Sequence, residues 1–130
     1  MVVGEAHLER IEDLPRARAL ISPELGIPED TLNDCLTALT EAVANALTHG
    51  RRNGSPFCRV LVEVEAGEVR ITVEDRGSGF HWGGLGLDMP PWDAVHGRGV
   101  PLIRSLMDSV AIRSTSDGTR IHMRKRVAAA

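Results

Sequence analysis

Four short segments in which apolar and polar residues alternate constrain the fold of this chain most strongly. The clearest is residues 69–74, Val-Arg-Ile-Thr-Val-Glu, and residues 60–65, 110–115 and 119–127 follow the same pattern. A period of two is typical of a strand that buries one face and exposes the other. Ala66-Gly67 and Ser116-Asp117-Gly118 join these segments in pairs and fit tight hairpin connections. The sequence therefore predicts antiparallel strand pairs whose apolar face must be covered.

A long amphipathic segment supplies that cover. Between residues 29 and 49, apolar residues recur every three to four positions, at Leu32, Leu36, Leu39, Val43 and Leu47. This spacing predicts a helix with one apolar side. The acidic residues Glu29 and Asp30 suit the positive end of its dipole, and Gly50 provides a stop.

The rest of the chain completes a small α+β domain. We expect a short edge strand within residues 6–11, a first helix up to Ile21, a loop at 51–56 and a short helix over 100–107. These elements predict a two-layer α/β sandwich, in which a mixed, mainly antiparallel sheet carries its helices on one face. We expect one domain over residues 1–130.

Composition narrows the possible functions. The chain has 130 residues, a formal charge of −3 and only 3% aromatic residues, which disfavours a broad nucleic-acid surface with stacking platforms. Two cysteines are too few for a disulfide framework, and Cys35 lies within the apolar helical stripe, where a buried thiol is expected. No signal peptide or apolar run of about 18 residues is visible, so we expect a cytoplasmic protein without a membrane partner.

Polar residues on the long helix suggest chemistry. Glu41, Asn45 and His49 are spaced four apart and stack along one side, roughly opposite the leucine stripe. A solvated polar face would explain them. Asparagine is unfavourable inside helices, however, its amide oxygen suits magnesium, and a carboxylate one turn away could act as a base.

Two glycine-containing motifs flank a long glycine-rich segment, residues 76–99. Asp75-x-Gly77-x-Gly79 follows a predicted strand, where a carboxylate could meet a ligand amine while the backbone approaches closely. Gly97-Arg98-Gly99 precedes a predicted helix, whose free N–H groups suit phosphate. Each motif alone is often only a turn. The chain contains no G-x-x-x-x-G-K-[ST] phosphate loop.

Taken together, these motifs resemble the conserved boxes of the GHKL ATPases, which have the Bergerat fold. The resemblance runs from about His7 to Val127 and is carried by four stretches: LTEAVANALTHG, ITVEDRGSGF, GRGVPLIRSLMD and DGTRIHMRKR. Within that superfamily the chain is most similar to small bacterial anti-sigma factors that are also serine protein kinases.

The resemblance implies a site for ATP and Mg²⁺. It makes Glu41 the general base and Asn45 the magnesium ligand, with His49 near the phosphates. Asp75 would bind the adenine amino group, and Thr119 would complete the adenine side. Glycines and their neighbours would shape the pocket and hold the phosphates, and the full set is Gly77, Gly79, Gly97, Arg98, Gly99 and Val100. Residues 81–96 would form the ATP lid.

The resemblance also implies partners. It predicts a homodimer that binds a sigma factor, to which Arg16 or Arg18 could contribute, and that phosphorylates a serine of a STAS-type anti-anti-sigma protein. Two alternatives stay open. One is a non-enzymatic nucleotide-binding switch or co-activator, and the other is a detached histidine-kinase catalytic domain.

Overall fold

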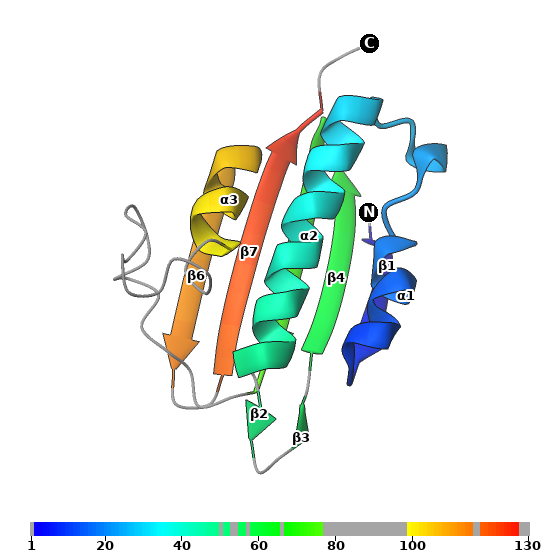
Figure 1. Ribbon diagram of the computed structural model, residues 1–130. Coiled ribbons are helices and arrows are strands. Elements are labelled where there is room, and N and C mark those ends of the chain that lie inside the picture. Colours follow the sequence, from blue (N-terminus) through cyan, green and yellow to red (C-terminus); the bar gives the residue numbers. More distant parts are fainter. Residues whose placement is uncertain are drawn as a thin grey trace.

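The protein is a five-stranded sheet with its helices on one face (Figure 1). The computed structural model describes residues 2–49, 51–52, 55–56, 58–65, 67–76, 99–115 and 118–127. The sheet has the order β1-β4-β5-β7-β6, and its strands are β1 (Val2–Leu8), β4 (Cys58–Glu65), β5 (Glu68–Asp75), β7 (Gly118–Arg126) and β6 (Ser109–Thr115). Every strand pair within these residues is antiparallel. The predicted two-layer α+β sandwich is confirmed.

Alternation along the strands decides which residues enter the core. In β5, Val69, Ile71 and Val73 are at most 1% exposed, and they face the helices. Arg70 and Glu74, between and after them, lie half-buried on the opposite face. The period of two predicted from the sequence therefore separates a dry face from a polar one.

The long helix α2 (Glu29–His49) packs over the middle of the sheet, against β4, β5 and β7. Its predicted extent is confirmed. Leu39 and Val43 are fully buried, as are the smaller Cys35, Ala38 and Ala42, which let the helix approach the strands closely. Burying a leucine or valine side chain of this kind contributes about 1.5–3 kcal/mol.

Two shorter helices flank α2 on the same face: α1 (Leu14–Arg18) and α3 (Gly99–Leu106). Single-turn helices precede and follow α1, η1 (Ile11–Asp13) and η2 (Pro23–Leu25). The predicted helix over 100–107 is thus confirmed to within one residue. No helix in the described part of the chain is long and apolar enough to cross a membrane.

Three boundary predictions were wrong. The edge strand β1 starts at Val2 and ends at Leu8, because antiparallel pairing with β4 extends it beyond its own weak alternation. The first helix ends at Arg18, after which Ile21 makes only a turn bond to Arg18 before Ser22-Pro23.

Residues 51–56 were predicted to be a loop. Instead Arg51–Arg52 (β2) and Ser55–Pro56 (β3) pair with each other across two residues. The intervening sequence is Asn53-Gly54, a strong hairpin signal, which favours a short strand pair on either side of it.

Several elements end or begin at one end of the sheet. In the registers, Asp75 at the end of β5 lies opposite Cys58 of β4 and Thr119 of β7. Figure 1 shows that α2 ends at this same end, while α3 runs in the opposite direction to α2. This arrangement gathers the motif residues in one region.

Candidate functional site

The first part of the site is a carboxylate at the end of β5. Asp75 continues the buried alternation of that strand and is only 8% exposed. Its Oδ1 accepts a hydrogen bond from the backbone N–H of Thr119, with an N–O distance of 3.2 Å. An ionised carboxylate can accept several hydrogen bonds, so the Thr119 amide orients Asp75 without using all of its acceptor capacity.

Gly118 makes this approach of two strands possible. Its φ is +151°, and a β-carbon at this position would collide with the carbonyl oxygen of Asp75. Only glycine fits there without displacing one of the strands. The sequence placed Gly118 in a hairpin turn, whereas the structure shows that it also sets the spacing beside Asp75.

A cavity of about 330 Å³ lies at this end of the sheet. Two of the predicted residues, Asp75 and Thr119, line it, together with Glu74, Arg76, Arg113, Gly118 and Arg120. The arginines were not identified from the sequence. Their only sequence signal is a polar position in an alternating strand, which does not distinguish a cavity wall from a solvated face.

A buried thiol lies directly beside the carboxylate. Cys58 is the register partner of Asp75 and is fully buried. Burial, reinforced by the nearby Asp75 carboxylate, raises the pKa of Cys58 to about 12. The thiol is therefore neutral near pH 7 and packs in the hydrophobic core as a small, unreactive side chain. Cys35 is also buried, as predicted, and burial raises its pKa to about 11.

Glu41 and Asn45 form the second part of the candidate site. Both side chains are half-buried, so they do not form the fully solvated polar face that would explain them without a function. Each residue turns a helix by about 100°, which puts both on the same side of α2 as Asp34. The ion pair between Asp34 Oδ2 and Lys125 Nζ, at 3.0 Å, identifies this side. The same Nζ donates to the carbonyl of Leu106, the last residue of α3, at 2.5 Å.

This geometry brings the start of α3 near Glu41 and Asn45. Leu106 is held level with Asp34, and α3 runs back against the direction of α2 (Figure 1). Seven residues of helix cover about 10 Å, which places Gly99 level with the Glu41–Asn45 turn. The free N–H groups of a helix start and a half-buried carboxylate–amide pair therefore come from adjacent helices.

Val100 contributes to the site differently from a ligand side chain. Its side chain is 1% exposed and packs in the core with Ile103 and Met107. Only its backbone could meet a bound group. The helix α3 is thus anchored by its apolar side at its start and by Lys125 at its end.

Some predicted site residues lie outside the described part of the chain. These are the side chain of His49, Gly77, Gly79, the lid at 81–96, Gly97 and Arg98. Glu41 and Asn45 do not line the 330 Å³ cavity at Asp75. The described residues contain no cluster of three or more His, Cys, Asp or Glu side chains able to hold a metal ion.

Comparison with known proteins gives a consistent result. A family model described as the histidine kinase-like ATPase domain matches residues 5–125. The anti-sigma F factor of Pasteuria penetrans is 37% identical over 108 residues, which cover 77% of this chain and 71% of the relative. The serine-protein kinase RsbW of Staphylococcus aureus is 29% identical over 112 residues, covering 78% of this chain and 70% of the relative.

Solved structures share the fold. The RsbU and RsbW domains of a Mycobacterium tuberculosis protein align with a TM-score of 0.71 at 22% identity, covering 98% of this chain. The match covers 33% of that solved chain, so the present chain is similar to one third of it. The catalytic domain of the histidine kinase ThkA aligns with a TM-score of 0.58 at 12% identity, covering 95% of this chain and 97% of ThkA's domain.

Proposed function

The chain belongs to the histidine kinase-like ATPase domain family, and from that membership we propose that it is an ATP-dependent serine protein kinase that acts as an anti-sigma factor. Relatives named anti-sigma F factor and serine-protein kinase RsbW support this proposal. The observation that carries the nucleotide site is the Asp75 carboxylate, held nearly buried by the Thr119 amide. We propose a single ATP-binding domain over residues 1–130, with a lid at 81–96.

In the proposed complex Asp75 recognises adenine. The exocyclic amine of adenine donates a hydrogen bond, and a carboxylate is a charged acceptor for it. Because Asp75 is only 8% exposed, a base without that amine would lie against a nearly buried carboxylate and offer it no donor. Sites of this kind discriminate strongly against analogues that lack the donor. Thr119 supports the carboxylate, and Gly77 and Gly79 are proposed to form the adjoining pocket wall.

The proposed phosphate end lies between α2 and α3. The start of α3, with Gly97, Arg98, Gly99 and the backbone of Val100, would bind the phosphates through N–H groups and positive charge. Asn45 would supply an amide oxygen to Mg²⁺, and His49 would lie nearby. Magnesium commonly takes only one or two protein ligands and shares the nucleotide phosphates, which fits a site without a carboxylate cluster.

The proposed transfer depends on position and charge. Bound magnesium would neutralise charge that develops on the phosphates. Glu41, one helical turn from Asn45, would accept the proton of the attacking serine hydroxyl. The serine oxygen would bond to the γ-phosphorus as the bond from that phosphorus to the β,γ-bridging oxygen breaks, and ADP would leave. The serine is proposed to belong to a STAS-type anti-anti-sigma protein. We also propose that the protein is a homodimer in the cytoplasm. It would hold a sigma factor or release it, depending on whether that antagonist is phosphorylated.

Two arginines on α1 were expected to contact the sigma factor. Arg16 Nη2 donates to the carbonyl of His7 at 2.7 Å, yet its side chain is 61% exposed and remains accessible to an acidic partner. Arg18 Nη1 donates to Thr40 Oγ1 at 2.6 Å and thereby ties α1 to α2. We therefore propose Arg16 as the contact residue and assign Arg18 a packing role.

The kinase proposal is tested by incubating the protein with γ-labelled ATP, Mg²⁺ and candidate STAS-type proteins. The parent should label one serine, and Glu41→Gln should lower the rate at least about 100-fold, as expected for a lost general base. Glu29→Gln is the matched control, because it removes an exposed carboxylate at the far end of the same helix. ATP binding without any transfer by the parent would instead support the non-enzymatic switch.

A further inference from the structure

The helices leave one face of the sheet uncovered (Figure 1). On that face the strand registers align side chains into rows that cross the sheet. One row consists of His7, Arg59, Glu74, Arg120 and Arg113, each opposite the next on the neighbouring strand. From β4 to β6, the adjacent row consists of Leu61, Thr72, His122 and Ala111. On β1, Glu5 lies opposite Leu61. Between β4 and β6 the first row is charged, whereas the second has no fixed charge.

The second row is the floor of a groove. A cavity of about 510 Å³ lies on this face, and both rows contribute to its lining, apart from His7. On its floor, Thr72 Oγ1 and His122 Nδ1 are 2.8 Å apart and satisfy each other, while Leu61 and Ala111 add apolar surface. From β4 to β6 the groove crosses three strand spacings, about 14 Å, which matches four to five extended residues.

The charged row along the groove has fewer carboxylates than arginines. Glu74 is shared by Arg59 at 2.8 Å and by Arg120 at 3.4 Å. Arg113 lies directly opposite Arg120, and like charges in that relation destabilise a sheet. The groove lining contains three arginines, Arg59, Arg113 and Arg120, and one carboxylate. Arg59 also pairs with Glu5, which lies outside the lining, so the excess of positive charge lies at Arg113 and Arg120. Within the described residues the Arg113 side chain has no ion-pair or hydrogen-bond partner.

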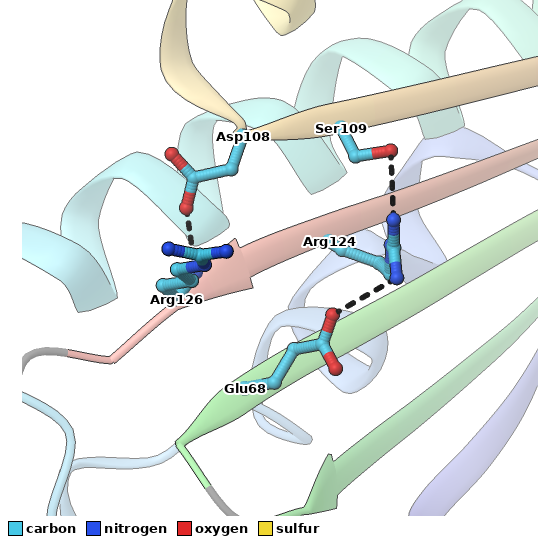
Figure 2. A pocket seen from close by; sticks show the side chains of 5 residues that line it. All are labelled: Glu68, Asp108, Ser109, Arg124 and Arg126. Carbon is cyan, nitrogen blue, oxygen red and sulfur yellow. Dashed lines mark hydrogen bonds and ion pairs between the residues drawn. The ribbon is translucent and has the colours of Figure 1, made fainter.

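The other end of the same face is balanced. A cavity of about 300 Å³ there is lined by Glu68, Asp108, Ser109, Arg124 and Arg126, whose side chains are drawn in Figure 2. There Arg124 lies between Glu68, at 3.5 Å, and the Ser109 hydroxyl, at 3.4 Å. Asp108 Oδ2 accepts a hydrogen bond from the backbone N–H of Arg126 at 2.6 Å, and the lining holds two arginines and two carboxylates. The excess of positive charge is thus local to the groove and does not extend over the whole face.

We propose that this groove binds an acidic segment of a protein partner. Carboxylates of the segment would pair with Arg113 and Arg120 and relieve their repulsion, while its apolar side chains would rest on Leu61 and Ala111. Nucleic acid suits the groove less well, because the chain carries a net charge of −3 and the described lining of the groove contains no Phe, Tyr or Trp for stacking. The inference goes beyond the proposed kinase. Glu74, Arg113 and Arg120 also line the cavity at Asp75, so the test is made without ATP.

Fluorescence anisotropy without nucleotide tests the proposal. The probe is a fluorescein-labelled ten-residue peptide of alternating glutamate and leucine, compared with one in which lysine replaces glutamate. The parent should bind only the acidic peptide and should bind it more weakly as salt rises. Arg113→Gln with Arg120→Gln should lower the affinity roughly five- to tenfold, since exposed charge pairs are individually weak.

Arg126→Gln is the matched control, because it removes an exposed arginine from the same strand and face at the balanced end. It should change the affinity less than twofold. Arg113→Gln alone should leave the fold intact, since it breaks no side-chain hydrogen bond or ion pair within the described residues. It should still weaken binding of the acidic peptide. Equal binding of both peptides, or an equal loss in Arg126→Gln, would overturn the proposal. So would sedimentation showing that the parent dimerises through this face and that Arg113→Gln separates the protomers.

Discussion

The backbone N–H of Thr119 donates a hydrogen bond to Oδ1 of Asp75 across the β5–β7 ladder, at 3.2 Å. These two residues are 44 positions apart in the chain. Their meeting depends on the register of the two strands, and Gly118 permits it because any side chain there would strike the Asp75 carbonyl. The carboxylate is thus positioned by the fold before any ligand arrives.

Asp75→Asn should weaken ATP binding by about 10- to 100-fold. The substitution keeps the shape and one acceptor for the Thr119 amide, but it replaces a charged acceptor, for which about 1.5–3 kcal/mol is typical. Isothermal titration of ATP into both proteins measures the loss. Asp30→Asn, on the exposed start of α2, is the control and should bind like the parent. Unchanged affinity in Asp75→Asn would remove this residue from the site.

Gly118→Ala should destabilise the protein by at least about 2 kcal/mol, since it combines a positive φ of +151° with a collision against Asp75. Urea denaturation followed by circular dichroism measures the change. Gly26→Ala is a suitable comparison, because Gly26 has φ +75° but nothing within 4 Å of the added carbon, and it should cost only about 1 kcal/mol. Similar losses for the two variants would show that the collision is relieved cheaply.

The parts of this fold that the sequence predicts are those with strong local periodicity. Val69, Ile71 and Val73 identify a strand by themselves, and the apolar stripe of α2 identifies its extent. The bounds of the edge strand β1 were wrong because apolar and polar residues do not alternate cleanly along Val2–Leu8. Val2, for example, is apolar but 60% exposed. The facing pair Arg113 and Arg120 depends on the register of the hairpin, in which Thr115 pairs with Gly118. The sequence instead placed Gly118 inside the turn, and a turn of different length pairs different residues, so the two arginines were not identified as neighbours.

Lys125→Met should weaken both stability and ATP binding. Lys125 is only 18% exposed and joins Asp34 of α2 to the last carbonyl of α3, so its loss frees the end of the helix whose start is proposed to hold phosphate. We expect a loss of about 1–2 kcal/mol in stability. Thermal melts and ATP titrations should both shift.

Lys125→Arg serves as the rescue variant for that experiment, since a guanidinium keeps the charge and its donors. ATP affinity should recover in part along with stability. If Lys125→Met lowers the melting temperature but binds ATP like the parent, Lys125 holds the helices together without positioning the phosphate site.

The buried thiols predict a loss of stability in alkaline solution. Burial raises the pKa of Cys58 from 9.0 to about 12, so the folded state holds the proton more tightly than the unfolded state. The resulting stability is complete below about pH 9 and is lost as the pH rises toward 12, by at most about 1.4 kcal/mol per pH unit. Urea denaturation at pH 7, 9 and 10 measures the slope. Cys58→Ala should flatten it, and an unchanged slope would assign the effect to other groups.

Asn45→Ala should show whether Asn45 binds magnesium or the nucleotide itself. If the Asn45 amide oxygen is a ligand of Mg²⁺, its loss should weaken ATP binding about tenfold in magnesium but leave binding in EDTA nearly unchanged. Asn33→Ala is the matched control, because Asn33 is an exposed residue on the same helix three turns away. Titrations with and without magnesium give two affinities for each protein. An equal loss in EDTA would mean that Asn45 contacts the nucleotide directly, and no loss in either condition would exclude it from the site.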